Sequence, residues 1–230
     1  MIALFLAASA AEPVAVVELY TSQGCSSCPA ADEVLARIAK SSRADDTPVY
    51  VMSFHVDYWN KLGWADPYSD ARWTTRQREY SASLGEAGRV YTPQVVVNGT
   101  QHAVGSQEPL VKALIAGALS KEAVATVSGS TKVSDGKVVV EVSTENAPKN
   151  ALLYVAVVEP ERKNAIPKGE NRGQTGVHAN VVRAMVKAET PTSKGAIPVP
   201  EGVDPAAVEV FAWVQDPLTN QVLGAAKLAR

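Results

Sequence analysis

Two different spacings of apolar residues alternate along the first half of the chain. Residues 14–20 (VAVVELY) are rich in β-branched and aromatic side chains, which is typical of a buried strand. From Ala31 to Ile38, apolar residues recur at intervals of three and four, which indicates an amphipathic helix. Residues 48–56 form a second apolar run. We therefore predict a strand–helix–strand unit whose two parallel strands are central in a sheet.

Further elements complete this part of the chain. Ser69 or Asp70 is a suitable N-cap for a helix. Asn98-Gly99 is typical of a two-residue hairpin turn and is flanked by two short strands. The predicted elements are a helix at 70–84, strands at 95–97 and 101–104, and a helix at 107–119. With the first unit they give the order βαβαββα, an α/β domain over residues 12–119.

From about residue 120 the pattern changes to short apolar or alternating segments separated by turn signals such as Asp135-Gly136. This pattern is typical of a β-sandwich of six or seven strands, so we predict an all-β, sandwich-like domain over residues 120–230. The polar, glycine-rich segment 168–176 is predicted to be a hairpin loop. The predicted strands are 125–133, 137–143, 152–158, 177–186, 207–214 and 222–228.

Residues 1–11 (MIALFLAASAA) combine a short apolar run with the small-x-small sequence Ala8-Ser9-Ala10. This combination predicts a secretory signal peptide and therefore a periplasmic or secreted protein. The alternative is an apolar first strand that begins at Met1. Charge and hydropathy narrow the function classes further. The net charge of −2 argues against a nucleic-acid binder, and no apolar run reaches the roughly 18 residues that span a membrane.

The only two cysteines of the chain, Cys25 and Cys28, are three positions apart. A disulfide between them closes too short a loop to stabilise the fold strongly, so the spacing favours chemistry over structure. Cys25 precedes the predicted helix, whose N-terminus stabilises a thiolate and makes this cysteine the attacking group. Cys28 lies one turn inside the helix and is the predicted resolving thiol, less exposed than Cys25.

The histidines bear on two alternatives. A copper or zinc carrier could use both cysteines with a histidine, but a metal site usually needs a second ligand pair at short spacing. His55, His102 and His178 are far apart in sequence and show no such spacing, so we predict no metal site. His55 ends the second strand. It is a candidate to tune the Cys25 thiolate, and the alternative is a hydrogen-bonded core residue.

The first half resembles the thioredoxin superfamily. The resemblance rests on Cys25-Ser26-Ser27-Cys28 between a strand and a helix, on Thr92-Pro93 before a strand, and on the element order. The segment 92–99 followed by Gly105-Ser106 is similar to the corresponding part of glutaredoxins. The tryptophan that precedes the cysteines in thioredoxin is replaced by Gln23-Gly24. The segments FHVDYWNKLGWADP, YTPQVVVNG and GENRGQTGVHANVVR resemble a family of secreted bacterial thioredoxin-like proteins of unknown function.

The resemblance implies a thioredoxin-like α/β domain that exchanges thiols and disulfides through Cys25 and Cys28 without a bound cofactor. It also implies that Pro93 is cis and lies beside the cysteines. The backbone of Tyr91 and Thr92 would then pair with an extended, cysteine-containing protein or a small thiol. The alternative role of Pro93 is to begin an edge strand. The redox partner is not identified. The competing hypothesis is a non-enzymatic binding protein in which the thioredoxin-like domain is a scaffold and the β-sandwich is the partner-binding surface.

Overall fold

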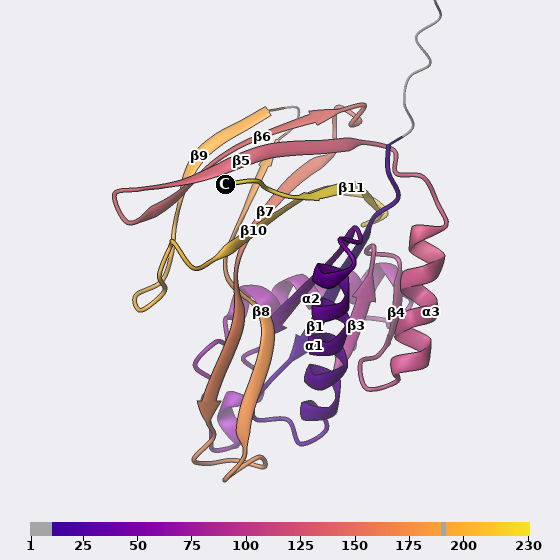
Figure 1. Ribbon diagram of the computed structural model, residues 1–230. Coiled ribbons are helices and arrows are strands. Elements are labelled where there is room, and N and C mark those ends of the chain that lie inside the picture. Colours follow the sequence, from indigo (N-terminus) through magenta and orange to yellow (C-terminus); the bar gives the residue numbers. More distant parts are fainter. Residues whose placement is uncertain (1–10, 190–191) are drawn as a thin grey trace, which may run out of the picture.

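The computed structural model describes residues 11–189 and 192–230 (Figure 1). The predicted signal peptide, residues 1–11, lies outside the described residues except for Ala11. Among the helices of the described ranges, none is both long and apolar enough to cross a membrane.

The elements predicted for the first half are present. Asp70 is the N-cap of α2, and its side chain accepts a hydrogen bond from the Arg72 N–H. β1 and β2 are parallel, and β1 is antiparallel to β3. The elements are β1 (Ala15–Thr21), α1 (Pro29–Ala44), β2 (Val49–His55), the short 3-10 helix η1 (Asn60–Leu62), α2 (Ala71–Ser83), β3 (Gln94–Val97), β4 (Gln101–Val104) and α3 (Glu108–Leu119).

The second half is built from strands, as predicted. β9 was not among the predicted strands, because Ile197 is its only buried apolar residue and provides no periodic signal. The glycine-rich segment is the hairpin loop between β7 and β8. The strands are β5 (Thr126–Ser134), β6 (Lys137–Glu145), β7 (Leu152–Ala165), β8 (Thr175–Glu189), β9 (Thr192–Pro198), β10 (Glu209–Gln215) and β11 (Val222–Lys227).

The strands of both halves form one continuous sheet, which we call the large sheet. Within the described residues its order is β11-β10-β7-β8-β2-β1-β3-β4, and β5-β6-β9 form a separate small sheet. The predicted fold class, an α/β thioredoxin-like domain followed by an all-β sandwich-like domain, is therefore wrong. Since β8 lies beside β2, the second half extends the sheet of the first half instead of closing its own sandwich.

The junction between β2 and β8 explains this difference. An unpaired edge at β2 would expose backbone hydrogen-bonding groups. β8 covers that edge in a parallel pairing of Ser53 with Val181. Two side chains reinforce the junction: Ser53 Oγ donates to the Ala179 carbonyl at 2.7 Å, and Asn180 Nδ2 donates to the Val51 carbonyl at 2.7 Å. The sequence around Ser53 and Asn180 does not indicate that these polar side chains bind backbone carbonyls of a distant strand.

Alternate residues of the large sheet face different layers. Val17 and Leu19 pack with α1 and α3, whereas Val16 and Tyr20 point to the opposite face with α2. The small sheet packs on β7 and β10. The layer that contains α2 crosses the junction, because Phe54 of β2 and Trp213 of β10 belong to the same buried cluster. The two halves thus share one core.

A buried ion pair anchors α2 to the large sheet. The Arg76 guanidinium donates through Nε and Nη2 to the Glu18 carboxylate of β1, at 2.6 and 2.8 Å. Tyr80 donates to Glu18 at 2.5 Å. The guanidinium also stacks on Tyr154 of β7 and Trp213 of β10, with distances of 4.7 and 5.3 Å to the ring centres. A single side chain therefore connects α2 to strands from both halves.

Candidate functional site

The two cysteines form a disulfide in the turn between β1 and α1. Their Cα atoms are 5.4 Å apart, and the Cys28 N–H donates to the Cys25 carbonyl at 3.1 Å. α1 begins at Pro29, so Cys28 is its N-cap and does not lie one turn inside the helix as predicted. Cys25 precedes the helix by one turn. The pair therefore sits at the positive end of the α1 dipole.

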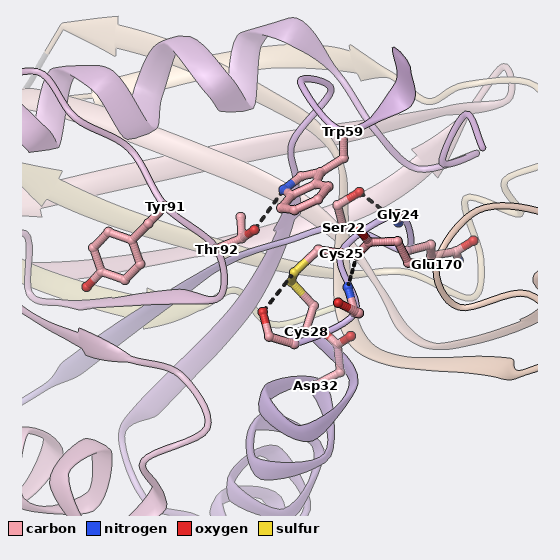
Figure 2. Close-up of a disulfide and its surroundings, with 12 residues drawn as sticks. Ser22, Gly24, Cys25, Cys28, Asp32, Trp59, Tyr91, Thr92 and Glu170 are labelled. Carbon is pink, nitrogen blue, oxygen red and sulfur yellow. Dashed lines mark hydrogen bonds between the residues drawn. A yellow bond between two sulfur atoms is a disulfide. The ribbon is translucent and has the colours of Figure 1, made fainter. Parts of the chain in front are cut away.

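The Thr92–Pro93 peptide is cis, as the resemblance implies. Trp59 connects this peptide to the cysteine turn, since its indole Nε1 donates to Thr92 Oγ1 at 2.8 Å. Trp59 also packs against Gly24, where an added Cβ would lie only 3.1 Å from the Trp59 Cβ. Figure 2 shows the indole between Thr92 and the residues that precede Cys25. The loop 57–69 thus supplies a tryptophan beside the cysteines that the adjacent sequence lacks.

The backbone around Pro93 is only partly free to bind an extended chain. The Tyr91 carbonyl accepts a hydrogen bond from Gln77 Nε2 at 2.7 Å, and the Pro93 carbonyl accepts one from the Gly105 N–H at 3.0 Å. Within the described residues, the N–H and C=O of Thr92 have no hydrogen-bond partner. The Tyr91 carbonyl is therefore not available for the predicted docking, whereas the N–H and C=O of Thr92 are.

Both cysteines are fully buried, at 0% exposure, so Cys28 is not the less exposed of the two. The β7–β8 loop contacts the cysteine turn at two residues. The Ser26 N–H donates to Glu170 Oε2 at 3.0 Å. Asn171 Nδ2 donates to the carbonyls of both Gln23 and Cys25 at 2.9 Å. Figure 2 shows Glu170 reaching the turn from the side opposite Thr92.

His55 lies in a buried polar cluster and makes no hydrogen bond to either sulfur in the described structure. Its Nδ1 is 2.7 Å from Asp66 Oδ2, and its ring is edge-on to that of His178, with 4.5 Å between the ring centres. Asp66 also accepts hydrogen bonds from the N–H groups of Gln23 and Tyr68. His55 thus holds Asp66 in place, as the alternative prediction of a hydrogen-bonded core residue expects.

Sequence reasoning missed Asp32 and His178. His178 Nδ1 of β8 lies 3.3 Å from Asp32 Oδ2 of α1, and both side chains are buried. Gln23 Nε2 lies 3.1 Å from His178 Nε2. Among the described residues, Asp32 Oδ1 has no hydrogen-bond partner. The one available signal was that Asp32 follows Cys28 by four residues, which places both on one face of the helix.

The pKa values of Asp66 and His178 shift in opposite directions, each towards the charged form. Burial acts to raise the pKa of Asp66, but His55 and the two backbone N–H groups outweigh it and lower that pKa. Burial acts to lower the pKa of His178, but Asp32 and Asp66 outweigh it and raise that pKa.

The described ranges contain no group of metal ligands. In these ranges, no three His, Cys, Asp or Glu side chains lie close enough together to hold a metal ion. His102 lies apart from the other histidines and contacts Tyr91 and Glu86. Neither the disulfide nor the buried cluster therefore has the arrangement of a metal centre.

A family model described as "Protein of unknown function (DUF1223)" matches residues 16–215. The chain belongs to this family. The matched range includes the cysteine pair, Thr92-Pro93, the His55 cluster and the β7–β8 loop. No protein among those with curated descriptions matches the chain.

Two solved structures resemble this DUF1223 member over nearly its full length. A structural-genomics crystal structure from Agrobacterium tumefaciens is 28% identical, covers 96% of each chain and has a TM-score of 0.67. The structure of HBP35 of Porphyromonas gingivalis is 14% identical, covers 94% of this chain and 75% of the other, and also has a TM-score of 0.67. At that identity, the second likeness shows the fold alone.

Proposed function

We propose that this DUF1223 protein is a thiol–disulfide oxidoreductase that acts in the periplasm or outside the cell. We further propose that the β1–α3 segment is related to the thioredoxin superfamily. The observation that carries the proposal is the cysteine pair at the N-terminus of α1 beside a cis Thr92–Pro93 peptide. Within the part of the chain that the structure describes, the Thr92 backbone is unpaired. Cys25 and Cys28 are the electron carriers, and no bound cofactor takes part.

Exchange begins when the Cys25 thiolate attacks one sulfur of a substrate disulfide. A bond forms between Cys25 and the substrate, the substrate disulfide breaks, and one substrate thiolate leaves. The Cys28 thiolate then attacks Cys25 Sγ. The second substrate thiolate leaves, and the Cys25–Cys28 disulfide forms. Two electrons and two protons have moved from the pair to the substrate, and the same steps in reverse oxidise a dithiol.

Asp32 supports the second step by accepting the proton of the Cys28 thiol. Side chains on a helix lean towards its N-terminus, so Asp32 covers the turn that contains Cys28. Its Oδ1 is buried and lacks a partner in the described structure, and His178 lies beside its Oδ2. This role takes the place of the thiolate-tuning role that the sequence suggested for His55.

The Thr92 backbone is the proposed docking point for the substrate. An extended, cysteine-containing segment can add to Thr92 as a short strand, pairing with its N–H and C=O. The Trp59–Thr92 hydrogen bond fixes this residue next to the cysteine turn. A small thiol needs no such pairing and would contact only the sulfur atoms.

The reduction potential of the Cys25–Cys28 pair in a glutathione redox buffer tests the proposal, with Cys25→Ser as the control that cannot form the disulfide. A value between about −120 and −200 mV supports an oxidase or isomerase. A value near about −270 mV supports a reductant that receives electrons from a donor. A value below about −300 mV, together with a reduced Cys25 that does not react with iodoacetamide, overturns the proposal.

The complete burial of the disulfide favours a second candidate, a non-enzymatic binding protein in which the disulfide is structural. For this candidate, we expect the Cys25–Cys28 reduction potential to fall in the lowest of the three ranges. It also expects that replacing both cysteines by serine lowers stability and leaves binding of the partner intact. The oxidoreductase expects the same double variant to remain folded and to lose all exchange activity.

A further inference from the structure

Two residues that hold the cysteine turn come from a segment far from it in sequence. Glu170 and Asn171 belong to the loop between β7 and β8, and Asn171 is 146 positions from Cys25 in sequence. Asn171 is only 1% exposed although it is polar and lies at a hairpin tip. Its amide spans two carbonyls of the cysteine turn. These two hydrogen bonds from a buried side chain make the contact between the loop and the turn a specific one.

The loop is internally ordered for this contact. Its base is closed by hydrogen bonds from the Gly173 N–H to the Ile166 carbonyl and from the Ile166 N–H to the Gln174 carbonyl, at 2.8 and 3.0 Å. Gly169 has a positive φ of 77° and comes so close to Trp64 that an added Cβ would lie 3.0 Å from the Trp64 Cβ. Glycine is therefore required there, and the tip docks as a formed unit.

We propose that the loop 166–174 is a lid on the exchange centre and that Asn171 is its latch. This inference rests on the exchange reaction proposed above, since a disulfide at 0% exposure cannot be attacked in line by a thiol. The lid opens when the two Asn171 hydrogen bonds and the Glu170–Ser26 hydrogen bond break and Gly169 separates from Trp64. The base of the hairpin, held in the large sheet, stays in place.

The closed lid favours the oxidised pair. The Glu170 carboxylate occupies the Ser26 N–H, one residue from Cys25, at the positive end of α1. After reduction, a Cys25 thiolate is stabilised by the same helix end, and two negative charges then compete for it. Reduction therefore weakens the lid, and by linkage the closed lid makes the disulfide harder to reduce.

The rate at which dithiothreitol reduces the folded protein tests the lid. Each reaction breaks the Cys25–Cys28 bond, leaves two cysteine thiols and converts the reagent to its cyclic disulfide. Asn171→Asp keeps the shape of the latch and replaces its donor with an oxygen that faces two carbonyls. We expect reduction of this variant to be about tenfold faster than that of the wild type, because a larger fraction of molecules is open.

Arg172→Ala is the matched control, since Arg172 is the exposed neighbour in the same loop, and its rate should equal that of the wild type. The wild-type chain unfolded in guanidinium gives the rate for a freely accessible disulfide. Equal rates for folded and unfolded wild type overturn the lid, as do equal rates for wild type and Asn171→Asp. If Asn171→Asp does not fold, Glu170→Gln at the exposed contact takes its place, and again an unchanged rate overturns the proposal.

These rates separate the lid from the proposed function. A fast Asn171→Asp variant shows that the lid controls access even if the reduction potential turns out to be that of a structural disulfide. If the reduction potential is that of a reactive disulfide but Asn171→Asp leaves the rate unchanged, the oxidoreductase proposal holds and the lid proposal is overturned.

Discussion

Asp66 is the most heavily bonded carboxylate near the cysteines. Donors from three segments reach its two oxygens: the His55 ring and the N–H groups of Gln23 and Tyr68. Gln23 lies two residues before Cys25, so Asp66 fixes the start of the cysteine turn. A charged acceptor in this position makes hydrogen bonds about twice as strong as a neutral one.

Asp66 should make stability depend on pH in the acid range. Its pKa is lowered in the folded protein, so its contribution is present above the unfolded pKa of about 3.9 and is lost as the pH falls through the folded pKa. Asp66→Asn should lower the free energy of unfolding by about 1–3 kcal/mol at neutral pH and flatten its acid dependence. Urea unfolding at several pH values measures both effects, with the exposed Asp135→Asn as the control. If the free energy of unfolding of Asp66→Asn falls with acid pH as steeply as that of the wild type, the prediction is contradicted.

Asp32 should control the speed of the resolving step. In Asp32→Asn the Cys28 thiol loses its proton acceptor, and decay of the mixed disulfide on Cys25 should slow by about a hundredfold. Stopped-flow kinetics with a chromogenic disulfide follow this decay. Glu33→Gln, the exposed carboxylate next to Asp32, should have no effect. If both variants resolve at the wild-type rate, another group takes the proton.

At the scale of elements, α2 depends on a charge that lies inside the protein. Arg76 and Glu18 are both buried, and each satisfies the other. Tyr154 and Trp213 form an aromatic surface against the guanidinium. Removing one partner of such a pair leaves an uncompensated buried charge.

Arg76→Met should therefore lower the free energy of unfolding by about 3–5 kcal/mol. The double change Arg76→Met with Glu18→Gln should recover a large part of the loss, because the carboxylate that lost its partner is then gone. Urea denaturation of the two variants measures this, and Arg78→Met on the exposed side of α2 is the control. A double variant less stable than Arg76→Met would show that the pair itself, and not the unpaired charge, dominates.

Most elements were predictable because their signals are local. The apolar run before Cys25, the Asp70 cap and the Asn98-Gly99 turn each depend on neighbouring residues. The cis Thr92–Pro93 peptide followed from the resemblance. The latch was not predictable, since Asn171 in a polar, glycine-rich loop carries no sign of the two carbonyls that it binds.

At the scale of the molecule, the junction between β2 and β8 decides the architecture. The sequence indicated a change of character near residue 120 but not that β8 returns to the edge of β2. Ser53 and Asn180 make that junction, and a serine and an asparagine in strands have no apolar period to reveal it. The partner of a sheet edge is a long-range choice, which periodicity along the chain does not encode.

Breaking the junction should destabilise both halves together. Asn180 has a φ of 48°, so Asn180→Gly keeps the backbone and removes the amide that binds the Val51 carbonyl. We expect a loss of about 1–3 kcal/mol. Hydrogen exchange should accelerate equally at the slowest amides of β1 and β10. Asn146→Gly, an exposed asparagine that also has a positive φ, is the control. Acceleration in β10 alone would mean that the halves unfold independently.

The distance along the chain between the cysteines and the latch also determines the order in which they are synthesised. Synthesis runs from the N-terminus, so Cys25 and Cys28 emerge well before Asn171, 146 residues later. Until the β7–β8 hairpin docks, any cellular oxidant can reach both thiols. Docking then closes the loop more firmly over the oxidised pair than over the reduced pair. The compartment in which the new chain folds therefore sets the redox state of its cysteines, and an oxidised pair keeps that state until the lid opens.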